Sequence, residues 1–225
     1  MRLGEMLEQG QGVTRDSAAA SRWYLRVAEN GHSFAQIQVA KMYAEGRGVI
    51  QNHEEAARWY ERAATLGDPL AQFHIGMMYE RGNGVTRDYA EASRWYRLAA
   101  DQGDAFAQMH LGEMYQMGRG VPQDYVMATE WYIRSADQGH SEAQFKLGSL
   151  YALRKDYIHA HKWLNLCAAS GHEPAQTKFV SIASEMTPEQ IEEAQQLARH
   201  WNEKKNHQAS SEAAAESDGT STSDS

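Results

Sequence analysis

The sequence predicts an all-α fold: an α/α solenoid of about five helix-turn-helix repeats with a 36-residue period, a C-terminal capping helix and a disordered tail. Tryptophan and glycine recur every 36 residues through four units and after 32 residues in the fifth. A residue suited to capping a helix N-terminus also recurs once in each unit. A fixed period of this length indicates stacked helical repeats. The recurring residues are Trp23, Trp59, Trp95, Trp131 and Trp163; Gly31, Gly67, Gly103, Gly139 and Gly171; and Asp16, Asn52, Asp88, Asp124 and Asp156.

Each unit should contain two helices, and the third unit shows why. Asp68-Pro69 provides an N-cap and a proline at the first helical position, and Gly82 ends that helix. Asp88 caps a second helix, which Gly103 ends. The solenoid is expected over residues 1–186, with units at about 1–32, 33–68, 69–104, 105–140 and 141–172 and then a linker.

The recurring tryptophans are expected in the core. Alanine follows each of them about one turn later, and a small residue there lets a neighbouring helix approach closely. Burying an indole removes about 150–250 Å² from water, which is worth at most about 4–6 kcal/mol. A row of tryptophans that stacks ligands is the alternative, but residues that recur in every unit are typical of the framework.

The C-terminal part departs from the period. Thr187-Pro188-Glu189-Gln190 is a capping box with proline at the first helical position. It predicts a capping helix over 187–204, whose polar outer face would end the stack in water. Residues 205–225 are rich in Ser, Ala and acidic residues and hold no large apolar residue. This composition predicts a disordered tail.

The N-terminal end lacks a cap. Met1-Arg2-Leu3-Gly4 aligns with Phe73-His74-Ile75-Gly76, so the first helix begins about one turn late. Either the chain is a fragment or mis-started form of a longer one, or this end packs against a second copy. Localisation stays open for the same reason: cytoplasmic as written, periplasmic if a signal peptide precedes Met1 in the full reading frame.

Composition excludes several classes of partner. The net charge is −8, and Lys and Arg do not cluster, so the electrostatic footprint of a nucleic-acid-binding protein is missing. No apolar run approaches the roughly 18 residues that a membrane-spanning helix needs. Cys167 is the only cysteine and cannot form an internal disulfide.

Positions that differ between units are the candidates for partner binding, because the recurring positions hold the repeats together. On the first helix of each unit they are spaced i, i+4, i+7 and i+11, which places them on one stripe. In a stacked solenoid the first helices would line the concave groove, where apolar anchors and charges suit a peptide or helix from another protein. The candidates are Phe34, Gln38, Lys41 and Glu45; Leu70, His74, Met77 and Arg81; Phe106, His110, Glu113 and Met117; and Glu142, Lys146, Ser149 and Leu153.

Two alternatives apply to parts of this stripe. Phe34, Leu70 and Phe106 could pack between repeats instead of facing a partner, because their position is apolar in three units of four. His74 and His110 occupy equivalent positions and could share a metal ion, but no third ligand is specified. We therefore expect neither a metal nor a cofactor.

The sequence contains no catalytic constellation. Cys167 lies where a small buried apolar side chain is expected. His159 and His161 are two residues apart, so on a helix they point to different sides. There is no phosphate-binding loop, metal-ligand spacing or nucleophile elbow. We expect a protein that is not an enzyme.

One unit carries a motif that resembles a known family. Leu111-Gly112, Met114-Tyr115 and Gly118-Arg119-Gly120-Val121 are followed by Asp124 and Trp131-Tyr132. The pattern resembles the Sel-one-like repeat (SLR), related to the tetratricopeptide repeat, over residues 1 to about 176. The resemblance implies an α/α solenoid that acts as a scaffold or adaptor for protein complexes, and bacterial members are often associated with the cell envelope.

The resemblance leaves three functions to compare. The first is a protein-binding scaffold that holds a partner peptide or helix in the groove. The second is a cell-envelope protein that engages peptidoglycan or its enzymes. The third is a β-lactamase-like hydrolase, as a Cys-rich subset of the family resembles such enzymes. This chain lacks the regularly repeated Cys pairs of that subset, which argues against the third.

Overall fold

The fold is all-α, as predicted. The computed structural model describes the backbone of residues 2–219 and the side chains of residues 2–211, and within these it contains twelve helices and no strand. The chain divides into two compact units, residues 1–138 and 139–225. None of the described helices is long and apolar enough to cross a membrane.

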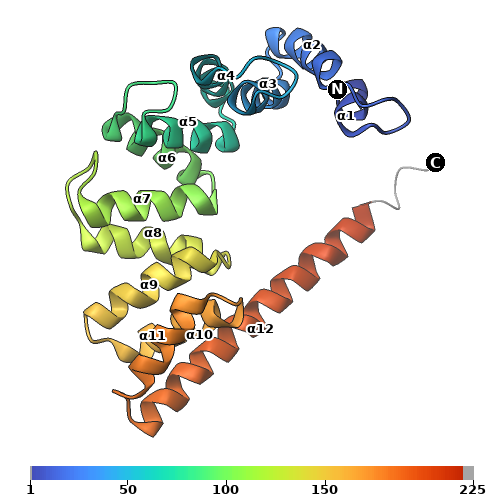
Figure 1. Cartoon of the computed structure of the whole chain (residues 1–225). Helices are drawn as coiled ribbons and strands as arrows, with labels where there is room; N and C mark the ends of the chain where they lie inside the picture. The colour runs from blue at the N-terminus through green and yellow to red at the C-terminus, as the bar shows by residue number, and fades with distance from the viewer. Residues whose placement is uncertain (1, 220–225) are drawn as a thin grey trace. The chain divides into compact units, whose positions relative to one another are not determined.

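The first unit contains eight helices, two for each of four repeats, and they follow one another in chain order (Figure 1). Ten of the helices form the five predicted pairs, because the fifth repeat supplies the first pair of the second unit. In the first unit the helices are α1 (Arg2–Gln9), α2 (Ser17–Glu29), α3 (Ser33–Glu45), α4 (His53–Thr65), α5 (Pro69–Arg81), α6 (Tyr89–Asp101), α7 (Ala105–Met117) and α8 (Tyr125–Asp137). In the second unit they are α9 (Ser141–Leu153), α10 (Tyr157–Ala169), α11 (Glu173–Ala183) and α12 (Pro188–Gly219).

The predicted caps begin the second helix of every repeat. The carboxylate of Asp16 accepts a hydrogen bond from the Ala19 amide, and that of Asp88 accepts from the amides of Ala90 and Glu91. Asn52, Asp124 and Asp156 do the same for α4, α8 and α10. The side chain thus satisfies an amide that the first turn of a helix leaves without a partner.

A glycine in each connecting loop sits against the main chain of the preceding repeat. Gly84, between α5 and α6, has a φ of +75°, and a Cβ atom there would lie 2.1 Å from the carbonyl oxygen of His53. Gly48 and Gly120 make the same approach to Ser17 and Tyr89, which also begin the second helix of the preceding repeat. Only glycine allows both this φ and this distance.

Four of the five recurring tryptophans lie in the core as predicted, with exposed fractions of 3–6%. Trp95 belongs to the same buried cluster as Ala56 and Trp59 of the preceding repeat. The prediction was wrong for Trp23, which is 42% exposed. Residues of α4 thus help to cover Trp95 on α6. In the described chain no repeat lies before the one that contains α2, so nothing covers the indole of Trp23 in the same way.

Two features of the second unit differ from the prediction. The expected linker after residue 172 contains α11, which begins with His172 as its N-cap and Pro174 in its first turn. Helix α12 begins at the predicted capping box, where Thr187 and Gln190 exchange hydrogen bonds of 3.0 and 3.3 Å. It continues to Gly219, past the expected end at 204, because the alanines and charged residues of this segment favour helix. Residues 220–225 of the expected tail lie outside the described residues.

Candidate partner-binding surface

The candidate residues of the first unit lie on the first helices of three successive repeats, α3, α5 and α7. We call these residues the first-helix surface. Its apolar members are partly exposed: Phe34 by 43%, Leu70 by 41%, Phe106 by 54% and Met117 by 49%. The full set is Phe34, Gln38, Lys41, Glu45, Leu70, His74, Met77, Arg81, Phe106, His110, Glu113 and Met117.

Neighbouring repeats touch each other within this surface. The ring centroids of Phe106 on α7 and Phe73 on α5 are 5.9 Å apart. Phe106 therefore makes an inter-repeat contact while more than half of its surface stays open to solvent. Packing between repeats thus holds for Phe106, and its exposed part remains a candidate for partner contact.

The two histidines of the surface stack on buried tyrosines. His74 lies on Tyr60, with ring centroids 4.8 Å apart, and His110 lies on Tyr96 at 5.1 Å. Burial, with a smaller contribution from the charge of Lys41, lowers the pKa of His74 to about 4. His74 is therefore neutral near pH 7. No group of three His, Cys, Asp or Glu side chains that could hold a metal ion is present among the described residues.

A tyrosine in the second helix of each of the first four repeats lies close to a residue near the end of the first helix. The hydroxyl of Tyr96 donates to the Glu80 carboxylate at 2.6 Å, and that of Tyr132 donates to the Gln116 amide oxygen at 2.7 Å. Tyr24 pairs in the same way with Glu8 at 3.3 Å. In the second repeat the equivalent tyrosine is Tyr60, and Ala44 occupies the acceptor position.

A cavity of about 140 Å³ opens beside Ala44. Three of the residues around it, His74, Met77 and Arg81, belong to the first-helix surface. The complete lining is Ala44, Tyr60, His74, Met77, Met78, Arg81 and Asn83. These three were candidates from the sequence, whereas Ala44 and Tyr60 were not, because neither lies on the varying stripe.

The repeat pattern and the paired helices match one family. The family model of the Sel1 repeat matches residues 1–32, 33–68, 69–104, 105–140 and 141–172. The chain belongs to the Sel1 repeat family. Sel1 repeat proteins are commonly protein-interaction scaffolds. A search of curated proteins found no match.

Solved structures of Sel1 repeat proteins share the fold and part of the sequence. A Sel1 repeat protein from Oxalobacter formigenes is 35% identical, with a TM-score of 0.73, over 90% of this chain and 84% of the other. The protein c5321, a protective antigen of uropathogenic Escherichia coli strains that displays an SLR fold, is 33% identical, with a TM-score of 0.78, over 90% of this chain. This chain spans only 45% of the c5321 chain. Immunity protein Pa5087 from Pseudomonas aeruginosa, at 19% identity and a TM-score of 0.51, shares the fold alone.

The remaining candidates of this Sel1 repeat protein lie in its second unit. On α9, the ammonium group of Lys146 is 3.7 Å from the carboxylate of Glu142, and Ser149 is half-buried. Leu153, at the end of the same helix, is 75% exposed. The framework residue Leu147 of α9 is fully buried, and of the varying positions on this helix only Leu153 is largely exposed.

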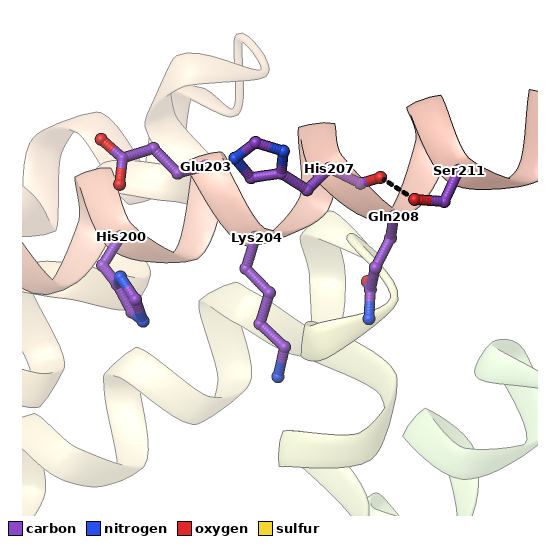
Figure 2. A pocket seen from close by; sticks show the side chains of 6 residues that line it. All are labelled: His200, Glu203, Lys204, His207, Gln208 and Ser211. Carbon is purple, nitrogen blue, oxygen red and sulfur yellow. Dashed lines mark hydrogen bonds between the residues drawn. The ribbon is translucent and has the colours of Figure 1, made fainter.

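The face of α12 borders an open hollow of about 720 Å³, and Figure 2 shows its six lining side chains. All of them come from this single helix, and Ser211 donates a hydrogen bond of 2.9 Å to the main-chain oxygen of His207. The described side chains that line the hollow thus all lie on one face of one helix. The lining residues are His200, Glu203, Lys204, His207, Gln208 and Ser211.

The residues considered for catalysis occupy structural positions in this Sel1 repeat protein. Cys167 is fully buried, its thiol donates to the Ser141 carbonyl at 3.1 Å, and burial raises its pKa to about 11. A thiol in this state is a poor nucleophile. His161 is buried, and its ring centroid lies 4.4 Å from that of Phe179. His159 is exposed, and its Nδ1 atom lies 2.9 Å from the Asp156 carboxylate.

Proposed function

We propose that this Sel1 repeat protein is a non-catalytic scaffold or adaptor that binds a peptide or helix of a partner protein along the first-helix surface. One observation carries the proposal: half-exposed side chains that vary between repeats, such as Phe34, Leu70 and Phe106, lie on α3, α5 and α7, whose recurring alanines Ala35, Ala71 and Ala107 are buried. A surface that varies on a constant framework is typical of repeat proteins that recognise other proteins.

The chemistry of the surface suits a protein ligand. Half-exposed Phe34, Phe106 and Met117 can anchor apolar side chains, and methionine adapts its shape to different partners. Lys41, Arg81 and Glu45 belong to the same surface and can select the register of a bound segment by charge. An extended peptide or an amphipathic helix presents matching side chains at regular intervals.

Affinity capture with the full chain tests the proposal. The parent, the quadruple variant Phe34→Ala/Leu70→Ala/Phe106→Ala/Met117→Ala and a control variant are each used to capture proteins from the lysate of the source organism, and the captured proteins are identified by mass spectrometry. The control, Ile50→Ala/Leu66→Ala/Leu98→Ala/Val126→Ala, removes four exposed apolar side chains that lie outside the first-helix surface. Circular dichroism verifies that all three chains fold.

A protein retained by the parent and the control, but lost by the surface variant, supports the scaffold and its location. That protein is then purified, and its dissociation constant is measured for each chain. Equal retention by all three folded chains contradicts the proposed surface. Retention of peptidoglycan fragments instead of protein would favour the envelope function, and turnover of a chromogenic β-lactam would favour the hydrolase.

A further inference from the structure

We infer that the cavity beside Ala44 receives the carboxylate of an aspartate or glutamate side chain from the bound partner, which accepts a hydrogen bond from Tyr60 and an ion pair from Arg81. The inference rests on the proposed function and names the anchor that the first-helix surface recognises. It is carried by a comparison among the four repeats of the first unit.

Three of these repeats contain their own acceptor for the tyrosine hydroxyl. Glu8, Glu80 and Gln116 each lie 16 residues before the tyrosine with which they pair, at distances between side-chain atoms of 2.6–3.3 Å. In the second repeat, Ala44 holds this position and has no polar side-chain atom. The space that a carboxylate or amide fills in the other repeats is therefore open in this one.

The tyrosine hydroxyl in the second repeat has no acceptor in the described part of the chain. Tyr60 is only 5% exposed, yet no described residue bonds its hydroxyl. Burial raises the pKa of Tyr60, and the nearby charge of Glu45 raises it further, so the hydroxyl keeps its proton and remains a donor. A ligand that supplies an acceptor at this position would give the hydroxyl the partner that its equivalents already have.

A second difference separates Tyr60 from its equivalents. In the third and fourth repeats a glycine lies under the tyrosine ring, and a Cβ atom on Gly76 would come within 2.8 Å of the ring of Tyr96. The second repeat has Ala40 at this position. The second repeat therefore differs from the third and fourth at two positions of its first helix, Ala40 and Ala44.

The lining of the cavity suits an acidic side chain. Met77, Met78 and Ala44 provide apolar walls for methylene groups, while Tyr60 and Arg81 provide donors. The volume of about 140 Å³ is several times the roughly 30 Å³ that one water molecule occupies in the liquid. A guanidinium group binds carboxylates through paired hydrogen bonds, and Arg81 forms no ion pair with any described residue.

The charges around the cavity favour an anion. Glu45 would repel a carboxylate, but its own carboxylate lies 2.5 Å from the guanidinium of Arg47. Arg81, which lines the cavity, supplies the positive charge that a carboxylate would pair with. His74 is neutral near pH 7 and adds no charge.

The first test measures whether the cavity accepts a carboxylate, without any partner. Ala44→Glu places the acceptor of Glu80 in the second repeat, and it is expected to raise the thermal unfolding midpoint by about 2–4 °C. The gain should vanish in the Tyr60→Phe background, which removes only the hydroxyl. A gain that persists with Tyr60→Phe, or a lowered midpoint for Ala44→Glu, overturns the inference.

The second test uses a displayed library of random 12-residue peptides, selected against the full folded chain. The selected peptides should share an Asp or Glu, and replacing it by Asn or Gln should weaken binding about tenfold or more. Ala44→Glu and Tyr60→Phe should weaken the binding of these peptides. Tyr96→Phe is the matched control, because the Tyr96 hydroxyl is already used by Glu80, and it should leave binding unchanged.

The outcomes separate this inference from the proposed function. One outcome is that the selected peptides fail to bind the Phe34/Leu70/Phe106/Met117 alanine variant and yet show no acidic preference and bind Ala44→Glu normally. That result would overturn the carboxylate site but support the first-helix surface. Peptides that bind the surface variant as well as the parent would contradict the surface itself. No enrichment of any peptide would overturn both.

Discussion

The hydroxyl of Tyr96 donates a hydrogen bond of 2.6 Å to the carboxylate of Glu80, and so connects the two helices of the third repeat. Tyr96 is fully buried, and burial together with this bond raises its pKa. The hydroxyl is therefore a donor that depends on one acceptor. Removing the Glu80 carboxylate should leave the Tyr96 hydroxyl without an acceptor, as Ala44 does for the Tyr60 hydroxyl in the second repeat.

Glu80→Ala should lower the free energy of unfolding by about 1–3 kcal/mol, because the Tyr96 hydroxyl is left buried without an acceptor. Adding Tyr96→Phe to that variant should recover part of the loss. Urea denaturation of the two single variants and the double variant measures the coupling between the side chains. Additive losses in this cycle would show that the hydrogen bond does not connect the two helices energetically.

Gly84→Ala should be among the most damaging small substitutions in the first unit. The added Cβ would lie 2.1 Å from the His53 carbonyl oxygen, and the φ of +75° is unfavourable for alanine as well. Gly103→Ala is the matched control, since its φ is +95° but no heavy atom lies within 4 Å of the added Cβ. We expect a loss of about 1–2 kcal/mol for the control and a clearly larger loss, or failure to fold, for Gly84→Ala. Similar unfolding midpoints for the two variants would argue against the close approach.

Trp95→Ala and Trp23→Ala should differ although the two residues occupy equivalent positions. Trp95 is 4% exposed, so its truncation should lower the free energy of unfolding by about 3–5 kcal/mol. Trp23 is 42% exposed, so its loss should be less than half as large. Chemical denaturation followed by circular dichroism measures both. A loss at Trp23 as large as at Trp95 would mean that the Trp23 indole is covered in solution, and sedimentation would then show whether a second copy covers it.

His74 should make stability depend on pH. Its pKa is lowered from 6.5 to about 4 in the folded chain, so the unfolded chain binds a proton more readily between these values. The contribution is present above pH 6.5 and is lost as pH falls toward 4, with about 2 kcal/mol lost between pH 7.5 and pH 5.

His74→Gln tests this dependence, because glutamine occupies the equivalent position 38 and does not titrate. The difference in free energy of unfolding between pH 7.5 and pH 5 should be smaller in the variant by about 2 kcal/mol. Urea denaturation at the two pH values measures it. The same pH dependence in both chains would show that His74 does not titrate as its burial requires.

The period of the sequence was sufficient to predict the five helix pairs, since each carries its own start and stop signals. Asp68-Pro69 and Gly82, for example, begin and end α5 as expected. Helix α11 was missed although His172-Glu173-Pro174 carries a comparable start signal, because the recurring Trp and loop glycines do not continue beyond it. The exposure of Trp23 could not be predicted from its own residue type, because it depends on a neighbouring repeat.

The candidate surface was predicted by comparing repeats, but its cavity was not. The spacing of 16 residues between Glu80 and Tyr96 is visible in the sequence and recurs with Glu8 and Gln116. Only the structure shows that these pairs form hydrogen bonds. It thereby identifies residue 44 as an acceptor position at which Ala44 provides no acceptor. Side-chain contacts between helices depend on packing angles that a linear pattern does not contain.

The loop glycines explain how one chain can carry several different faces. At Gly48, Gly84 and Gly120, successive repeats meet through main-chain atoms, so this part of the joint does not depend on the identity of outward side chains. Half-exposed positions that make no contact with the neighbouring repeat can therefore vary while the main-chain joint stays the same. The stack thus combines a constant joint with outward positions that differ from repeat to repeat.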